Sequence, residues 1–279
     1  MQERIGNVFV ARVPFVNTPL LATFSLNLNA FLKALVLAGK ERIDLVWAHE
    51  PTAGFFAFLL KLVTGIPYVL HVHSRGSLEP GSFLRRLALR LMELFAYRGA
   101  DKTIFVSKNV LREFVKEFCL NERECVFVPI GVQARRRRGK QIKEIIELRK
   151  RKKRIACFVG RLHSVKGVEY AIQAIAGLPN VALLIVGGGE EKRELEELSE
   201  SLGVSERIVF LGARIDLEKI LPYCDLFVLP SLSEGLPHSL LEALASGIPV
   251  VASNVGEIPN LIEAKYLVEP RNVEELRKK

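Results

Sequence analysis

Along almost the whole chain, short apolar runs alternate with stretches that have helical periodicity. Continuous apolar runs such as VALLIV (181–186) and DLFVLP (225–230) are typical of strands covered on both faces of a parallel sheet. Strands that alternate with helices of about ten to fifteen residues indicate right-handed βαβ units. We therefore expect an α/β protein built from doubly wound, Rossmann-like parallel sheets.

The same pattern predicts the position of each element. In the first half, we expect strands near 7–13, 43–48, 67–71, 102–106 and 125–129, and helices near 25–38, 52–64, 82–98 and 109–117. In the second half, we expect strands near 154–159, 181–186, 207–211, 226–230, 249–252 and 266–268, and helices near 166–177, 190–202, 216–223, 238–246 and 259–263. Ser107 is predicted to cap the helix that follows it. Leu20–Ala38 and Ala53–Val63 are strongly apolar but interrupted by Lys33 and Lys61, so we expect core helices rather than membrane spans.

Length and charge predict how the chain is divided. A chain of 279 residues is long enough for two domains. Residues 135–154 hold 12 Lys or Arg and 2 Glu, which leaves 28 basic against 29 acidic residues elsewhere. The chain is therefore near neutral apart from one basic segment, and we expect a domain over 1–131, a basic linker over 132–153 and a second domain over 154–279.

Cysteine usage and the N-terminus suggest a compartment. The 4 cysteines, at 119, 125, 157 and 224, show neither zinc-ligand nor disulfide-framework spacing. The first residues lack a basic segment followed by an unbroken apolar run, so no secretory signal is expected. These features favour a reducing, cytoplasmic location. An apolar content of 49% excludes an intrinsically disordered chain.

Charged residues gather at the predicted strand ends of the second half. The loop after strand 154–159 carries Arg161 and Lys166, which together could neutralise a pyrophosphate. After strand 226–230 come Glu234, Pro237 at a helix start and Glu242, about one turn into that helix. The free N–H groups of the helix start favour an anion, and Glu242 could accept hydrogen bonds from a ribose. Each feature alone is typical of ordinary surface residues, but their combination at adjacent strand ends predicts a diphosphate site.

In these motifs the chain resembles the retaining glycosyltransferases of family four, which have the GT-B fold. Glu234 and Glu242, eight apart in EGLPHSLLEALASGIPVVAS, resemble the family's E-x₇-E signature, and GRLHSVKG (160–167) resembles its G-R-x₄-K-G element. The resemblance covers nearly all of 154–271. In the first half it is looser and rests on IDLVWAHEP, PYVLHVHS and DKTIFVSK. It implies two Rossmann-like domains that face a cleft.

The resemblance also implies an activity and a set of site residues. The activity is transfer of a sugar from a nucleotide-diphosphate-sugar to an acceptor, with retention of the anomeric configuration and with no metal or cofactor. Arg161 and Lys166 would stabilise the departing diphosphate, Glu234 would contact the donor sugar and Glu242 would hold the ribose. The remaining implied residues are His73 near the donor sugar or acceptor, Arg214 at the base, and the donor-binding loop residues Gly160, Gly235, Leu236, Pro237 and His238.

The histidines support this site and argue against a metal centre. All five (His49, His71, His73, His163 and His238) fall at predicted strand ends or in the two motif loops. Their spacings match no metal-ligand pattern, so we expect polar lining of the site rather than metal ligands.

The chain also departs from the family pattern. No Gly-rich loop precedes Gly39, the helix at 273–279 stops early, and Val128–Val132 lacks the usual Asn-Gly pair. These departures predict a naturally short or truncated form in which donor binding survives better than turnover.

Three alternatives to an active transferase stay open. They are a non-catalytic nucleotide-sugar-binding protein, a nucleotide-sugar epimerase of similar fold, and phosphate-driven nucleic-acid binding through 135–154. The basic segment lacks interleaved aromatic residues, so no specific nucleic-acid partner is expected.

The acceptor is expected to be a glycan, a lipid-linked sugar or a small molecule. The basic amphipathic helix near 82–98 could rest on anionic lipid at the inner face of the membrane, whereas a core helix with a solvated basic edge is the simpler reading.

Overall fold

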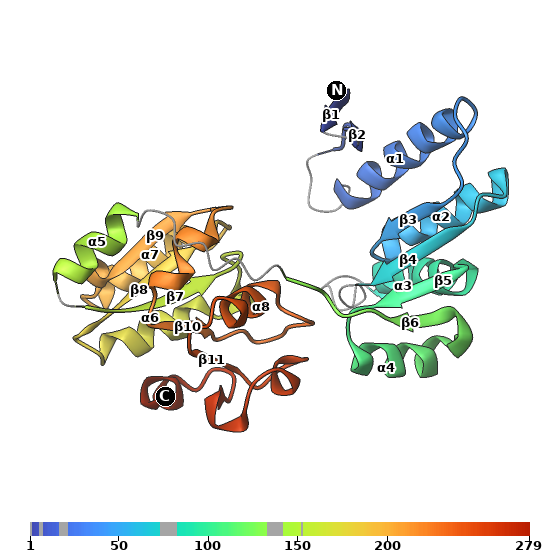
Figure 1. Cartoon of the computed structure of the whole chain (residues 1–279). Helices are drawn as coiled ribbons and strands as arrows, with labels where there is room; N and C mark the ends of the chain where they lie inside the picture. The colour runs from blue at the N-terminus through green and yellow to red at the C-terminus, as the bar shows by residue number, and fades with distance from the viewer. Residues whose placement is uncertain (1, 6–7, 17–21, 73–82, 133–141, 152) are drawn as a thin grey trace. The chain divides into compact units, whose positions relative to one another are not determined.

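A computed structural model describes residues 2–5, 8–16, 22–72, 83–132, 142–151 and 153–279 of the chain. The chain divides into two compact units, Met1–Pro129 and Ile130–Lys279, and each is described by itself (Figure 1).

Unit 1 contains a parallel sheet in the order β3-β4-β5-β6 and a separate two-stranded sheet. Its strands are β1 (Gln2–Ile5), β2 (Val8–Ala11), β3 (Val46–His49), β4 (Tyr68–Val72), β5 (Lys102–Phe105) and β6 (Cys125–Phe127). Its helices are α1 (Ala22–Ala38), α2 (Pro51–Thr64), α3 (Phe83–Gly99) and α4 (Lys108–Phe118). Ser107 caps α4 as predicted, because its Oγ accepts a hydrogen bond of 3.1 Å from the Val110 N–H.

The crossovers of unit 1 all step in one direction across the sheet. Right-handed connections of this kind place α2, α3 and α4 on one face. Ala48, Tyr68, Leu70 and Phe105 are buried on that face, whereas Trp47 on the other is 58% exposed. The parallel-sheet α/β arrangement expected from the sequence is therefore present in unit 1, with a buried core between the sheet and its helices.

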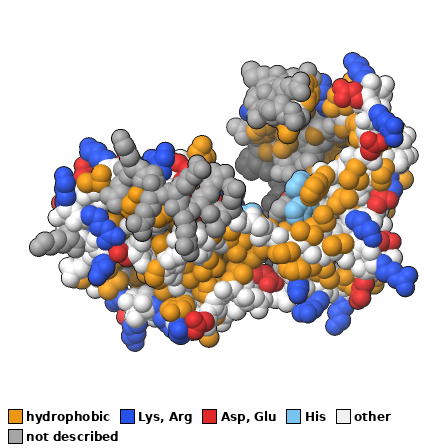
Figure 2. All heavy atoms as spheres, viewed as in Figure 1, with side chains coloured by type: hydrophobic (Ala, Val, Ile, Leu, Met, Phe, Trp, Pro, Cys, Tyr) orange, Lys and Arg blue, Asp and Glu red, His pale blue; other side chains and the backbone are white. Residues whose placement is uncertain are grey.

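Two expectations for the first half are wrong in detail. The strand predicted at 7–13 is β2, and it pairs antiparallel with β1 instead of joining the parallel sheet. The apolar segment Leu20–Ala38 was expected to form a core helix, but α1 has no fully buried residue, and Phe24 and Val36 are 47% and 50% exposed. In α2 the expectation holds, since Phe56, Ala57 and Leu60 are buried. Apolar side chains reach the surface of unit 1 over a wide area (Figure 2).

Unit 2 contains a six-stranded parallel sheet in the order β12-β11-β10-β7-β8-β9. Its strands are β7 (Arg154–Val159), β8 (Val181–Val186), β9 (Ile208–Gly212), β10 (Leu226–Leu229), β11 (Val250–Ser253) and β12 (Leu267–Val268). Its helices are α5 (Lys143–Lys150), α6 (Val168–Ala176), α7 (Lys192–Ser201), α8 (His238–Ala245) and α9 (Val273–Lys278). The central strands are buried on both faces, as their continuous apolar sequence predicts.

Part of the predicted linker belongs to unit 2. Residues 132–153 were expected to join two domains, but the boundary between the units falls after Pro129, and 143–150 form α5. Ile145 and Leu148 of α5 are buried in the unit 2 core. Despite its high charge, this segment forms an amphipathic helix, with Ile145 and Leu148 on the core side and Ile146 39% exposed.

Two predicted helices of the second half are shorter than expected. The segment 216–223 forms two 3₁₀ turns, Leu217–Lys219 and Leu221–Tyr223, and 259–263 overlaps only one, Ile258–Asn260. Pro222 would lie inside the first of these helices, where it cannot donate the backbone hydrogen bond that a longer helix requires. No helix in the described residues is long and apolar enough to cross a bilayer.

Candidate functional site

The candidate site lies where the strand order of unit 2 reverses. β7 sits at the centre of the sheet, and the chain moves outward from it to β8 and β9 on one side and to β10, β11 and β12 on the other. Loops at the carboxyl ends of the strands diverge at such a switch point, which is where open α/β sheets bind ligands. The loops that follow β7 and β10 are the two that carry the predicted motifs.

Lys166 and Glu234, from these two loops, form an ion pair. The Lys166 Nζ lies 2.7 Å from Glu234 Oε1, and the Ser231 Oγ also donates to Oε1 at 2.7 Å. The Glu234 side chain is only 7% exposed and that of Lys166 is 25% exposed. Sequence reasoning assigned Lys166 to a diphosphate and Glu234 to a sugar, and it did not predict that they contact each other.

Backbone contacts hold these two loops together. The Leu232 N–H donates to the Val165 carbonyl at 2.7 Å. Gly167 has a φ of 61°, and a Cβ at this position would collide with the Pro230 carbonyl oxygen. Only glycine meets both conditions without strain. The turn that carries Lys166 therefore packs tightly against the segment that follows β10.

The loop after β7 also contacts the glycine-rich segment that follows β8. The Gly160 and Leu162 N–H groups donate to the Val186 and Gly188 carbonyls at 3.0 and 2.9 Å, and a Cβ at Gly187 would collide with the Gly160 carbonyl oxygen. The glycines after β8 thus allow the loops after β7 and β8 to pack closely against each other. Gly160 lies at the end of β7, as predicted, and the Arg161 side chain beside it is exposed.

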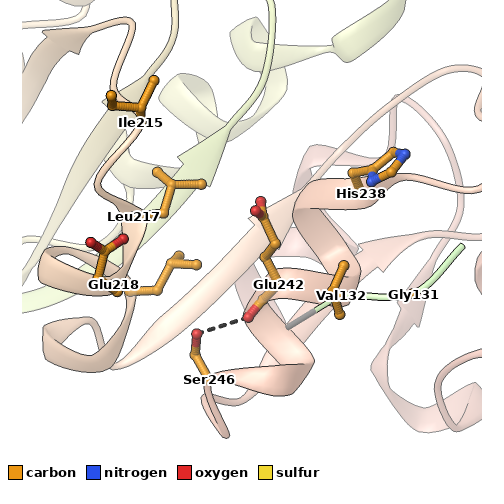
Figure 3. Close-up of a pocket in the computed structure, with 9 residues that line it drawn as sticks. Gly131, Val132, Ile215, Leu217, Glu218, His238, Glu242 and Ser246 are labelled. Atoms are coloured by element: carbon orange, nitrogen blue, oxygen red, sulfur yellow. Dashed lines mark hydrogen bonds between the residues drawn. The ribbon is translucent and has the colours of Figure 1, made fainter. Parts of the chain in front are cut away.

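A pocket of about 310 Å³ lies beside α8. Glu242 projects into it from α8, whose first residue, His238, also lines it, and the loop after β9 supplies another wall with Ile215 and Glu218 (Figure 3). The remaining lining residues are Gly131, Val132, Leu217, Leu221 and Ser246. Burial raises the pKa of the Glu242 carboxyl, and the charge of His238 offsets part of this rise. A half-buried carboxylate facing an open pocket can accept hydrogen bonds from ligand hydroxyl groups.

Arg214 lies near this pocket but is held by its own loop. Its guanidinium makes a bidentate ion pair with Asp216, with Nε 2.8 Å from Oδ1 and Nη2 2.9 Å from Oδ2. Hydrogen bonding by Arg214 is the main reason why the pKa of Asp216 lies well below its usual range, and Lys219 adds to the effect. Arg214 thus shapes the loop that carries Ile215 and Glu218, and it is not among the residues that line the pocket.

The other predicted residues fall in or near the same loops. Gly235, Leu236 and Pro237 form the connection from Glu234 to α8, with Pro237 buried immediately before the first helical residue, His238. The Glu257 N–H donates to the Gly235 carbonyl at 3.2 Å and anchors this connection. His73 lies outside the described residues, so its predicted role has no structural counterpart here.

Three further histidines occupy the strand ends or loops predicted for them. His49 and His71 face each other on β3 and β4, with ring centroids 5.2 Å apart. His163 caps the turn before Lys166 by accepting a hydrogen bond of 3.2 Å from the Val165 N–H, and its Nε2 lies 3.6 Å from Glu190. The described residues contain no group of three or more His, Cys, Asp or Glu arranged to hold a metal ion.

Sequence reasoning missed Ser231 and the residues of the loop after β9 that line the pocket. Ser231 is fully buried at the end of β10 and contacts Glu234 directly. A polar residue immediately after a buried apolar strand was the available signal. Ile215 and Glu218 carry no such signal, because only the fold brings the loop after β9 opposite α8.

Comparison with known families covers almost the whole chain. Residues 140–279 match the family described as Glycosyl transferases group 1, and residues 2–136 match Glycosyltransferase Family 4. These matches agree with the resemblance inferred from the motifs of the second half and extend it to the first.

Individual relatives point in the same direction. An uncharacterized glycosyltransferase of Methanocaldococcus jannaschii is 29% identical over 284 residues, covering 94% of this chain and 70% of the relative. A UDP-Gal:alpha-D-GlcNAc-diphosphoundecaprenol alpha-1,3-galactosyltransferase of Escherichia coli is 26% identical over 253 residues, covering 86% of this chain and 65% of the relative. The chain thus spans about two thirds of the length of these relatives.

Among solved structures, Anabaena HepE in complex with UDP and glucose has a TM-score of 0.76 with 25% identity, over 88% of this chain and 70% of that one. Together with the two parallel-sheet units, this likeness shows a GT-B-like fold.

Proposed function

The chain belongs to the glycosyl transferases group 1 family, and on that premise we propose that it transfers a sugar from a nucleotide-diphosphate-sugar donor to an acceptor with retention of configuration. The observation that carries the proposal is the convergence of Lys166 and Glu234 at the switch point of unit 2, beside the exposed Arg161 and the loop that leads to α8. Two cations, a carboxylate and a helix start, all supplied by neighbouring loops, suit a diphosphate that carries a sugar.

Each group has a distinct task in this proposal. Arg161 and Lys166 neutralise the diphosphate, assisted by the free N–H groups that begin α8 after Pro237. Glu242 accepts hydrogen bonds from the ribose hydroxyls in the pocket beside α8, with His238 at its rim. Glu234 contacts the donor sugar. No metal or cofactor takes part, and the nucleotide-sugar is a substrate.

Catalysis in this proposal is mainly electrostatic. As the bond between sugar and diphosphate breaks, negative charge grows on the departing phosphate oxygens. Cations already held near those oxygens stabilise the transition state more than the ground state, which lowers the barrier. The acceptor hydroxyl attacks from the face that the leaving group vacates and passes its proton to a departing phosphate oxygen, and the anomeric configuration is retained.

A lipid-linked acceptor at a membrane surface is the partner that we favour. The E. coli relative acts on a diphosphoundecaprenol acceptor, as its name states. In unit 1, α3 exposes Leu87, Leu91 and Phe95 at 47%, 49% and 47%, at a spacing of four residues. Such a stripe suits shallow contact with a bilayer. Arg90 of this helix is already paired with Glu117 at 2.7 Å, so we expect apolar contact to dominate.

Thermal shift with UDP, GDP and ADP tests donor binding. One of these diphosphates is expected to raise the melting temperature, and the double variant Arg161→Ala/Lys166→Ala is expected to abolish the rise. A Lys40→Ala variant, which changes an exposed cation of unit 1, serves as the matched control. If all three nucleotides leave the melting temperature unchanged, the proposal is wrong.

Sugar transfer is tested separately, with the matching sugar nucleotide and a panel of glycan and lipid-linked acceptors. Binding without transfer across this panel would favour the non-catalytic nucleotide-sugar-binding alternative.

A further inference from the structure

The Glu234 carboxylate is held in an asymmetric way. Lys166 Nζ and Ser231 Oγ both bond to the same oxygen, Oε1, each at 2.7 Å. Among the described residues, no group donates a hydrogen bond to the second oxygen, Oε2. Oε2 is not fully buried, so it keeps contact with solvent.

The two donors differ in how firmly they are placed. Ser231 is fully buried at the carboxyl end of β10, and its short side chain has one rotatable bond to the hydroxyl-bearing carbon. Lys166 is partly exposed and has a long, flexible side chain. A diphosphate arriving beside Lys166 would draw its ammonium group away from Glu234. Ser231 would then be the donor that keeps the carboxylate in place.

We propose that Ser231 is a positioning residue: its hydroxyl holds Oε1 of Glu234, so that Oε2 faces outward and accepts a hydrogen bond from a hydroxyl of the donor sugar. The proposal rests on the proposed function, since it deepens the role of Glu234 in the same site. It predicts that Ser231 acts on recognition of the sugar and not on recognition of the nucleotide, which is bound by other groups.

The experiment compares two ligands on the same variants. Calorimetry on the full chain measures the affinities for UDP and UDP-glucose. The same comparison is made for GDP and GDP-mannose and for ADP and ADP-glucose. In Ser231→Ala, we expect the affinity for the sugar nucleotide to fall about tenfold, because a charge-assisted hydrogen bond loses its orientation. The affinity for the free diphosphate is expected to stay within about twofold. Ser231→Thr, which keeps the hydroxyl, is expected to restore most of the loss.

Ser199→Ala is the matched control. Ser199 is also buried and also donates one hydrogen bond, to the Glu196 carbonyl at 2.7 Å, but it lies in α7 and outside both motif loops. Its removal is expected to leave both affinities unchanged. If Ser231→Ala folds poorly, Ser231→Cys replaces it, because a thiol of similar size is a weak donor and is expected to show the same selective loss.

The outcomes distinguish failure of the proposed function from failure of the positioning role of Ser231. If the wild-type chain binds none of the diphosphates, the proposed function fails, and this inference fails with it. If a diphosphate and its sugar nucleotide bind, but Ser231→Ala weakens both equally or neither, the proposed function stands and the positioning role of Ser231 is refuted.

Discussion

Replacing Gly167 with alanine tests whether the contact between the two motif loops builds the site. The backbone of Gly167 has a φ of 61°, and the added methyl group would meet the Pro230 carbonyl oxygen. Because that obstacle is backbone rather than a flexible side chain, relief requires the Lys166 turn to move away from the end of β10. Such a movement would pull Lys166 away from Glu234.

The size of the effect is the sum of two costs. A left-handed conformation costs alanine about 1–2 kcal/mol, and forcing a methyl group into a packed contact costs about 1–3 kcal/mol. We therefore expect Gly167→Ala to destabilise unit 2 by about 2–5 kcal/mol. Gly203→Ala is the control, because Gly203 has a φ of 66° and nothing within 4 Å of the added Cβ. It should lose only the conformational term, about 1–2 kcal/mol.

Urea unfolding followed by circular dichroism compares the two variants in the same unit. The midpoint should fall by about 0.5–1 M for Gly203→Ala and by about 1–2.5 M for Gly167→Ala. Binding of the nucleotide diphosphate should be lost only in Gly167→Ala. Equal midpoints for the two variants, or unchanged nucleotide binding in Gly167→Ala, would refute the reasoning that this backbone contact positions Lys166.

Three further predictions concern stability. Ile145→Ala should destabilise unit 2 by about 2–5 kcal/mol in urea unfolding, whereas Ile146→Ala, at a side chain that is 39% exposed, should cost far less if α5 belongs to the core. Burial tends to raise the pKa of Asp225, but the Ile155 N–H at 2.7 Å and two arginines lower it overall. Its stabilisation should therefore be lost as pH falls through the lowered pKa, and Asp225→Asn should flatten this acid limb of the stability profile. Burial raises the pKa of the Glu242 carboxyl, so its ionisation opposes folding once the pH rises above the pKa of a free glutamate. Glu242→Gln should therefore raise the melting temperature at pH 7, and a gain of the same size at pH 3 would contradict this account.

Local sequence determined most of the elements and the edge of the sheet where the site lies. Continuous apolar runs became the central strands of unit 2, and Ser107 became a cap because a hydroxyl beside free N–H groups needs no distant partner. The charged residues of the motifs follow β7 and β10, and parallel strands bring their carboxyl ends to one edge. The location of Lys166 and Glu234 could therefore be predicted from sequence.

Only the tertiary structure decided which groups contact each other. The ion pair between Lys166 and Glu234 joins residues 68 positions apart and depends on β7 and β10 being neighbours, a pairing that no local pattern encodes. The same holds for α5, whose charge suggested a linker until the core of unit 2 covered Ile145. Periodicity and capping arise from interactions within a few residues, so they can be derived from the sequence. Strand order and side-chain pairing arise from packing between distant segments, and they become visible only when the chain is folded.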